Sequence, residues 1–262
     1  MNMLNTQLKN HLKEKISKGK KCLGAWLQSG SPTCAEIFAQ AGFDFVIIDM
    51  EHGPHDFMTL GDQLRALRGT EVTPIVRTEW NDFVFAKRVL DIGAMGLHVP
   101  YVSTRAEVEY ALRSAWYPPQ GNRGMARSTR AAFYGQKPVP EMNEVNDKIW
   151  VMTAIETPEG VQNVEEIAST PGLDAVFLGP MDLACTSGYL LNQGAPEMIA
   201  LKSQIESTCS KLGTPLATIA PGMDEAEALF DKGYSMVAAM SDTVFLATQS
   251  IAAVTRFAKK YR

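Results

Sequence analysis

Two carboxylates follow apolar runs in successive segments of the chain, and their placement suits a metal site. Glu156 comes directly after residues 149–155, and Asp182 follows residues 175–178 once a Gly-Pro pair has ended that run. Because the carboxyl ends of neighbouring parallel strands meet at one edge of a sheet, both acids would project into one cleft. Their hard oxygen atoms, without a nearby Cys, favour Mg2+ or Mn2+ over structural zinc. For either acid alone, the alternative is that it complements a helix dipole.

A pair of acidic ligands would leave most of an octahedral ion open to water and to a chelating 2-oxo acid. Such an ion acts as a Lewis acid and stabilises the enolate that forms when a proton leaves C3 or a carbon-carbon bond breaks there. Arg77, at the end of TPIVR, would add a second positive group, although a salt bridge to Asp49 or Glu51 is the alternative. Free N–H groups in the turn 179–182 would hold the substrate carboxylate.

Proton transfer needs a group that titrates near neutrality, and the histidines are the candidates. His52 ranks first because it lies beside two acids on the turn that follows an apolar run. His98, within MGLHVP, ranks second and would point either into a barrel or toward the surrounding helices. His55 and His11 carry weaker signals.

A Schiff-base mechanism is the natural rival for carbon-carbon bond chemistry, and it requires a lysine near the carboxyl end of a strand. None of the expected strands contains one, since Lys148 precedes a strand and Lys87 lies in a helical pattern. The absence of such a lysine favours metal over covalent catalysis.

Apolar runs alternate with helical periodicity along the chain, which is typical of parallel βα units. The expected strands are residues 22–27, 45–48, 74–77, 95–99, 149–155, 175–178, 215–219 and 235–239. The expected helices include residues 34–41, 57–67, 83–91, 105–116, 159–168, 196–212, 224–231 and 242–261. This pattern predicts an α/β fold, a (β/α)8 TIM barrel with an extra N-terminal helix. No GxGxxG or GxxxxGK[ST] motif occurs, which argues against an open nucleotide-binding sheet.

Length and composition limit the classes of protein. At 262 residues the chain fits one barrel domain over residues 1–262, with an N-terminal helix in 1–21 and a final helix over 242–261. The net charge of -4 argues against a nucleic-acid partner, and no stretch reaches the roughly 18 apolar residues of a membrane span. Four cysteines without CxxC spacing are expected to be reduced thiols of a cytoplasmic protein. The expected partner is a small molecule.

The N-terminal helix is expected to be amphipathic. Its apolar face would cover the bottom of the barrel or contact another subunit, and it consists of Leu4, Leu8, Leu12 and Ile16. The longest irregular stretch, residues 117–147, is rich in Pro, Gly and Arg. It would pass beneath the barrel before the fifth strand, unless part of it folds over a neighbouring subunit.

Six sequence blocks occur in one order along most of the chain: IIDMEHGP, VRTEWND, LDIGAMGLHVPYV, YPPQGNRG, IET and FLGPMDL. Together they resemble the HpcH/HpaI aldolase family, named for 2,4-dihydroxyhept-2-ene-1,7-dioate aldolase. The resemblance implies a class II, metal-dependent pyruvate aldolase on a barrel of the phosphoenolpyruvate/pyruvate-domain type. It also implies a hexamer, a dimer of trimers, whose final helix is exchanged between neighbouring subunits.

The resemblance assigns roles position by position. It implies that Glu156 and Asp182 bind the metal and that Arg77 stabilises the enolate. It also implies that His52 and Asp91 form an acid/base pair, and that the backbone of Gly179 and Met181 holds the substrate carboxylate. In this arrangement Asp91 would reach His52 from an adjacent subunit, whereas its position at a helix end alone suggests a solvated side chain.

The chain departs from the family pattern in the pocket. Many relatives carry Gln two residues before the metal-binding Glu, where this chain has Ala154, and Met181 replaces a smaller residue. His98 could offset the missing amide if it points into the same pocket. These changes alter the shape of the pocket and its hydrogen bonding.

The loop 121–134 is expected to help select the acceptor. Its arginines, Arg123, Arg127 and Arg130, hint at an anionic acceptor, although loop arginines are more often solvated or interfacial.

The predicted activity is the reversible cleavage of a 4-hydroxy-2-oxo acid to pyruvate and an aldehyde, with a metal-stabilised pyruvate enolate as the intermediate. One alternative is a carbon-carbon lyase or synthase that decarboxylates oxaloacetate and passes the enolate to another acceptor. The other is a weakly active 2-oxo acid binding protein, which the substitution at Ala154 favours.

Overall fold

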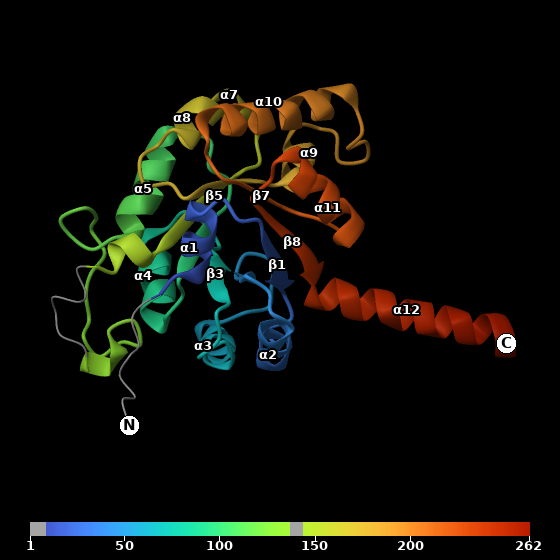
Figure 1. Cartoon of the computed structure of the whole chain (residues 1–262), viewed down its shortest axis with the longest axis horizontal. Helices are drawn as coiled ribbons and strands as arrows, with labels where there is room; N and C mark the ends of the chain where they lie inside the picture. The colour runs from blue at the N-terminus through green and yellow to red at the C-terminus, as the bar shows by residue number, and fades with distance from the viewer. Residues whose placement is uncertain (1–8, 137–143) are drawn as a thin grey trace.

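A parallel β-barrel forms the centre of the computed structural model, which describes residues 9–136 and 144–262 (Figure 1). Within these residues the strands pair in sequence order and β8 closes onto β1. The strands are β1 Cys22–Leu27, β2 Phe45–Asp49, β3 Thr73–Arg77, β4 Gly96–Val99, β5 Trp150–Ile155, β6 Ala175–Leu178, β7 Leu216–Ile219 and β8 Met236–Ser241. The predicted TIM barrel is confirmed, with each expected strand in its place.

The helices surround the barrel. They are α1 His11–Ser17, α2 Pro32–Ala41, α3 Phe57–Ala66, α4 Phe83–Ile92, α5 Arg105–Ala115, α7 Pro158–Gln162, α8 Val164–Ala168, α9 Pro180–Thr186, α10 Pro196–Leu212, α11 Met223–Lys232 and α12 Asp242–Tyr261, with short 3-10 turns at Phe133–Gly135 and Asn146–Lys148. The expected helix 159–168 is divided into α7 and α8 at Asn163, whose side-chain amide donates to the Ser103 carbonyl oxygen at 2.9 Å. β8 is longer than expected because a register shift opposite Gly24 and Ala25 inserts an extra residue, and the strand continues beyond it.

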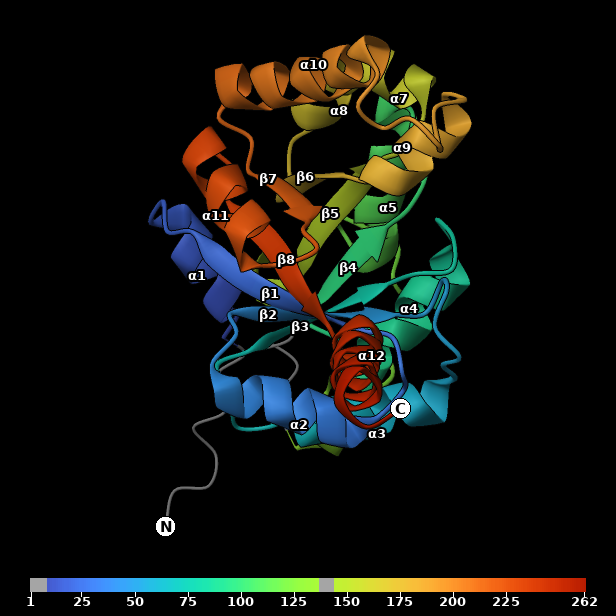
Figure 2. The same cartoon turned by 90° about the vertical axis from the view of Figure 1, so that its right-hand side faces the viewer.

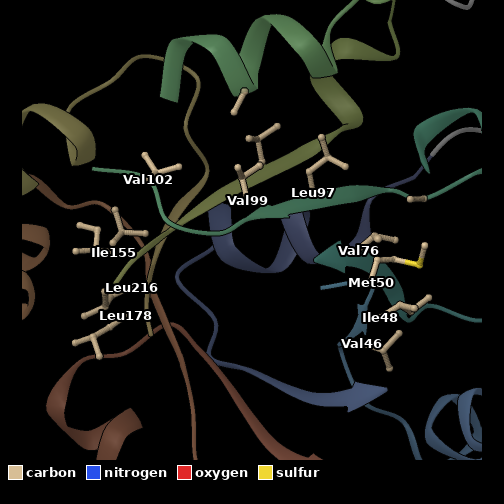
Figure 3. Close-up of a cluster of buried hydrophobic side chains, with 14 of the residues drawn as sticks. Val46, Ile48, Met50, Val76, Leu97, Val99, Val102, Ile155, Leu178 and Leu216 are labelled. Atoms are coloured by element: carbon tan, nitrogen blue, oxygen red, sulfur yellow. The ribbon is translucent and has the colours of Figure 1, made fainter. Parts of the chain in front are cut away.

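Side chains alternate along each strand between the barrel interior and the helices, as the period of two requires. On β2, Phe45 and Ile47 belong to the interior cluster, whereas Val46 and Ile48 pack against the helices. Figure 3 shows part of this outer layer, in which side chains from several strands meet the surrounding helices. The core therefore consists of two apolar layers, one inside the barrel and one between the strands and the helices. Together they hold the strands, and the residues at the strand ends, in place.

Helix α1 covers the amino-terminal end of the barrel. Leu12 is fully buried and belongs to the interior cluster, and its N–H donates to Thr73 Oγ1 at 3.2 Å. Asn10 caps α1 and donates to the carbonyl oxygens of Met95 and Lys148. The predicted plug is confirmed for this part of the helix, while Leu4 and Leu8 lie outside the described residues.

Helix α12 extends away from the barrel (Figures 1 and 2). Its only buried residue is Asp242, which accepts hydrogen bonds from the N–H groups of Gln28 and Ser29 and so ties the helix to the end of β1. The rest of the helix exposes large apolar side chains, namely Val244, Phe245, Leu246, Ile251, Val254, Phe257 and Tyr261. Within residues 9–136 and 144–262, no helix combines the length and hydrophobicity that a membrane span requires.

Candidate active site

Glu156 and Asp182 lie at the carboxyl end of the barrel, where Tyr101 connects them. Glu156 directly follows β5 and is 2% exposed, and Asp182 lies in the first turn of α9. Tyr101, just after β4, donates its N–H to Glu156 Oε2 at 2.9 Å and its hydroxyl to Asp182 Oδ1 at 3.3 Å. The two acids therefore face the same small region, as the spacing of the two strand ends predicted.

The backbone after β6 approaches Glu156 closely. A Cβ atom added at Gly179 would lie 2.5 Å from Glu156 Oε1, so no other residue fits there without a shift. The N–H of Gly179 donates to the Ile155 carbonyl oxygen at 3.3 Å. Helix α9 begins at Pro180, so the N–H groups of Met181 and Asp182 lie in its first turn, where intrahelical acceptors are missing. The helix start that the sequence predicts as an anion cradle thus lies beside the acid pair, and anion binding there stays a prediction.

Burial makes the charged form of Glu156 unfavourable. Desolvation raises the pKa of Glu156 to about 7, and the charges of Asp182 and Glu51 act in the same direction. The Tyr101 N–H and the more distant Arg77 charge only partly offset these effects. A cation between the acids would stabilise the ionised form, and two carboxylates are the hard oxygen donors that Mg2+ and Mn2+ prefer. Among the described residues, no group of three or more His, Cys, Asp or Glu side chains is placed to hold a metal ion.

Arg77 is buried beside the acid pair and is held by two other carboxylates. Its Nε and Nη2 atoms donate to Asp49 Oδ1 and Oδ2 at 2.9 and 2.6 Å, and Nη1 lies 2.9 Å from Glu51 Oε2. Burial alone would raise the pKa of Asp49, but the Arg77 guanidinium holds it below the ordinary value. The pKa of Glu51 is raised because its burial outweighs the attraction of Arg77.

Trp26 completes the setting of this arginine. Its Nε1 donates to Asp49 Oδ2 at 3.1 Å, and the Arg77 guanidinium carbon lies 4.7 Å from its ring centroid. The predicted alternative, a salt bridge to Asp49 or Glu51, is confirmed with both partners. This pairing also fixes the orientation of the guanidinium next to the two candidate metal ligands, Glu156 and Asp182.

His52 lies on the turn after β2, and its side chain is 56% exposed. The backbone N–H of His52 donates to Asp49 Oδ1 at 3.1 Å, and the ring Nε2 lies 3.9 Å from Glu51 Oε2. His55 follows in the same loop, and burial lowers its pKa. Of the two, His52 has the accessibility that proton transfer to a bound substrate needs.

His98 points into the barrel, one of the two directions that the sequence left open. Its ring is fully buried, 4.4 Å from the Phe177 ring and 6.0 Å from the Trp26 ring. Burial lowers the pKa of His98 well below its usual value, and neither ring nitrogen has a hydrogen-bond partner in the described part of the chain. Ala154 is also fully buried in the interior cluster, beside Phe177 in the strand register. His98 and Ala154 thus belong to the interior layers below the acid pair.

Asp91 and the loop arginines lie at the other end of the barrel within one chain. Asp91 is near the end of α4, and its Oδ1 accepts from the buried Arg123 at 2.7 Å. Arg123 and Arg130 line a cavity of about 810 Å3 that includes the start of β3. This cavity is at the opposite end of the barrel from Glu156, which follows the end of β5. Arg127 donates to the Gly135 carbonyl oxygen. These side chains could act at the acid pair only across a subunit boundary.

The sequence did not assign a role to two groups that contact the acids. Tyr101 closely follows an apolar run in the sequence, but nothing in its type indicates that it bridges both carboxylates. Thr186, the last residue of α9, donates its Oγ1 hydroxyl to the Glu156 carbonyl oxygen at 2.5 Å. The sequence did not predict this contact. The position just after β4 is the only signal for Tyr101, and Thr186, at the end of α9, has none.

A family model for HpcH/HpaI aldolase/citrate lyase matches residues 23–248. The chain belongs to this family. It is 38% identical over 250 residues to a pyruvate aldolase of Rhizobium etli, covering 95% of this chain and 98% of that relative. It is 36% identical over 252 residues to a 5-keto-4-deoxy-D-glucarate aldolase of Escherichia coli, with the same coverage of 95% and 98%.

A solved structure agrees with the sequence comparison. The crystal structure of a HpcH/HpaI aldolase/citrate lyase family protein from Burkholderia cenocepacia matches with a TM-score of 0.91 at 31% identity, covering 95% of this chain and 99% of that one. The resemblance noted in the sequence is therefore confirmed. The chain is an enzyme of the carbon-carbon lyase class, which the family's aldolases represent.

Proposed function

We propose that this HpcH/HpaI family member is a divalent-metal-dependent aldolase that reversibly cleaves a 4-hydroxy-2-oxo acid to pyruvate and an aldehyde. The observation that carries the proposal is the pair of acids, Glu156 and Asp182, connected by Tyr101 next to a buried arginine. Glu156 and Asp182 would hold Mg2+ or Mn2+, and the bound ion would supply Lewis-acid stabilisation of negative charge on the 2-oxo acid.

The protein groups around the acids have distinct tasks in this proposal. The backbone of Gly179 and Met181 at the start of α9 cradles the substrate carboxylate, with the N–H of Met181 as the donor because the N–H of Gly179 already bonds to Ile155. Arg77 faces the keto oxygen, and its fixed orientation between Asp49 and Glu51 means that little reorganisation is needed as charge develops there.

His52 moves the proton. In the cleavage direction it accepts the proton of the C4 hydroxyl, the C3–C4 bond breaks, and the bonding electrons become those of the pyruvate enolate as the aldehyde leaves. The enolate then takes this proton back from His52 at C3, directly or through a water molecule, which gives pyruvate and returns His52 to its neutral form. We further propose that Asp91 orients His52. This Asp91 would come from a neighbouring subunit, because within one chain Asp91 lies at the opposite end of the barrel.

The proposed assembly is a hexamer, a dimer of trimers, in which α12 is exchanged between neighbouring subunits. Support comes from α12 itself, which extends from the barrel with half or more of each of Phe245, Leu246 and Ile251 exposed. Apolar surface of that extent on one helix is characteristic of an interface. A cytoplasmic location stays a prediction.

The test is turnover of a 4-hydroxy-2-oxo acid with Mg2+ or Mn2+ and with a chelator. We expect activity only with the ion, and we expect Glu156→Ala and Asp182→Asn each to reduce it by at least about a hundredfold, the scale of one lost electrostatic group. Full turnover by Glu156→Ala in chelator would contradict the proposal.

The same assays separate the alternatives. Rapid release of CO2 from oxaloacetate, with transfer of the enolate to an acceptor and no cleavage of hydroxy-oxo acids, would favour the decarboxylating lyase or synthase. Binding of pyruvate without any turnover would favour the weakly active binding protein, and Ala154→Gln should then restore activity.

A further inference from the structure

An aromatic surface begins at the acid pair and faces solvent. Trp80, in the connection from β3 to α4, is 59% exposed, and its ring stacks on that of Tyr101 with centroids 5.9 Å apart and planes at 27°. Tyr101 in turn contacts both Glu156 and Asp182. A molecule held at the acids would therefore meet these two rings as it extends toward solvent.

Tyr101 has a backbone conformation that a residue with a large side chain rarely adopts. Its φ is +53°, in the left-handed region that favours glycine. The N–H bond to Glu156 and the hydroxyl bond to Asp182 hold the residue there. Such conformations persist where the surroundings fix them, and they concentrate at sites of function. The position of the ring is thus set by the same carboxylates that define the site.

Met181 adds a third apolar group next to Asp182. Its side chain is 54% exposed, and its sulfur lies 2.8 Å from Gln193 Nε2. Trp80 and Met181 are exposed and Tyr101 is half-buried, and such apolar groups are costly to leave in water and suit an apolar ligand. We call Trp80, Tyr101 and Met181 the apolar rim.

The charges next to the apolar rim are negative. Glu79 precedes Trp80 in the chain, Asp82 caps α4, and the two acids lie beneath Tyr101. Arg77, which lies beside the acids, is already paired with two carboxylates. Of the loop arginines that suggested an anionic acceptor, Arg123 and Arg130 line a cavity at the opposite end of the barrel within one chain.

We propose that the apolar rim binds the carbon chain of the aldehyde, and that the acceptor is an uncharged, apolar aldehyde, aromatic or aliphatic. The inference rests on the proposed aldolase activity and specifies its second substrate. A ring or an alkyl chain would stack on Trp80 and Tyr101, whereas a carboxylate tail would lie near Glu79 and Asp82, which flank Trp80 in the chain.

The experiment compares butanal with succinic semialdehyde in aldol addition to pyruvate, with Mg2+ present. The two aldehydes share a four-carbon chain and differ only in a terminal methyl or carboxylate group. We expect kcat/KM for butanal, and for benzaldehyde as a stacking probe, to exceed that for succinic semialdehyde by at least about tenfold. An equal or higher value for succinic semialdehyde would overturn the inference.

Variants of Trp80 connect the preference to the rim. Trp80→Ala should lower kcat/KM for benzaldehyde by about tenfold and leave the value for succinic semialdehyde within about twofold, whereas Trp80→Phe should retain the preference. Val84→Ala, which truncates another exposed apolar side chain four residues later, is the matched control and should change neither value. Equal losses for both aldehydes in Trp80→Ala would overturn the inference, as would a change in assembly showing that a neighbouring subunit covers Trp80.

Exchange of the pyruvate methyl protons with deuterated water separates this inference from the proposed function. Exchange needs no acceptor, so Trp80→Ala should exchange at the wild-type rate. If the wild type fails to exchange at all, the aldolase proposal fails and the acceptor proposal with it. If it exchanges normally but prefers the anionic aldehyde, only the acceptor proposal is overturned.

Discussion

Replacement of Glu156 by Gln tests the physical account of the acid pair without any assay of catalysis. Glu156 is 2% exposed, and its Oε2 accepts the Tyr101 N–H at 2.9 Å. A Gln side chain has nearly the same shape and can still accept that hydrogen bond through its amide oxygen. The substitution therefore removes the buried charge and little else.

The size and the sign of the effect follow from the pKa of Glu156, which rises from 4.5 to about 7 on folding. Between these pH values the folded protein retains a proton that the unfolded chain has lost, so the free energy of unfolding falls as pH rises. The penalty is absent below the unfolded pKa and complete above the folded pKa, where it amounts to about 3 kcal/mol. Metal-free Glu156→Gln should therefore be more stable than the wild type by about 3 kcal/mol at pH 8 and by less than about 1 kcal/mol at pH 5.

Urea unfolding in chelator at the two pH values measures this difference. A parallel series with excess Mg2+ or Mn2+ should stabilise the wild type, by about 2.7 kcal/mol at a hundredfold excess over Kd, and stabilise the variant far less. The reasoning is refuted if Glu156→Gln is less stable than the wild type at pH 8 in chelator. It is also refuted if the ion stabilises both proteins equally.

Two further predictions concern the packing of the barrel and its assembly. Leu12→Ala should lower the free energy of unfolding by about 2–5 kcal/mol, because Leu12 is fully buried in the interior cluster, whereas Leu191→Ala at a fully exposed position should change it by less than about 0.5 kcal/mol; similar values for the two variants would show that α1 does not close the barrel. Glu substitutions at Ile251 and Val254 of α12 should reduce the assembly to smaller species in analytical ultracentrifugation, and a wild-type protein that is already monomeric would contradict the proposed exchange of this helix.

The order of strands and helices could be predicted because each element has an unambiguous local pattern. Short apolar runs such as residues 175–178 are bounded by glycines and followed by the start of a helix. Only a closed parallel barrel accommodates eight such units in sequence. The barrel rule then placed Glu156 and Asp182 at one end. Boundaries were less certain where tertiary contacts decide them, as at Asn163, whose hydrogen bond to Ser103 breaks a helix that periodicity made continuous.

The contacts within the site could not be predicted, since they depend on distances between loops. The sequence left Arg77 as either an enolate stabiliser or a salt-bridge partner, and the structure shows that the salt bridges exist and also orient the group. Tyr101 bridges the acids through a positive φ that no residue type there indicated. The composition of the loop 121–134 suggests a role in binding the acceptor, yet within one chain Arg123 and Arg130 line a cavity at the far end of the barrel.

The central claim is that Glu156 and Asp182 hold a divalent ion at which pyruvate is converted to its enolate. Deuterium exchange at the pyruvate methyl group, followed by proton NMR, tests it most directly because no aldehyde is needed. We predict exchange with Mg2+ or Mn2+, loss of exchange in chelator, and a loss of at least about a hundredfold in Asp182→Asn with the ion present. Exchange that persists in chelator, or an Asp182→Asn protein that exchanges at the wild-type rate, would contradict the account.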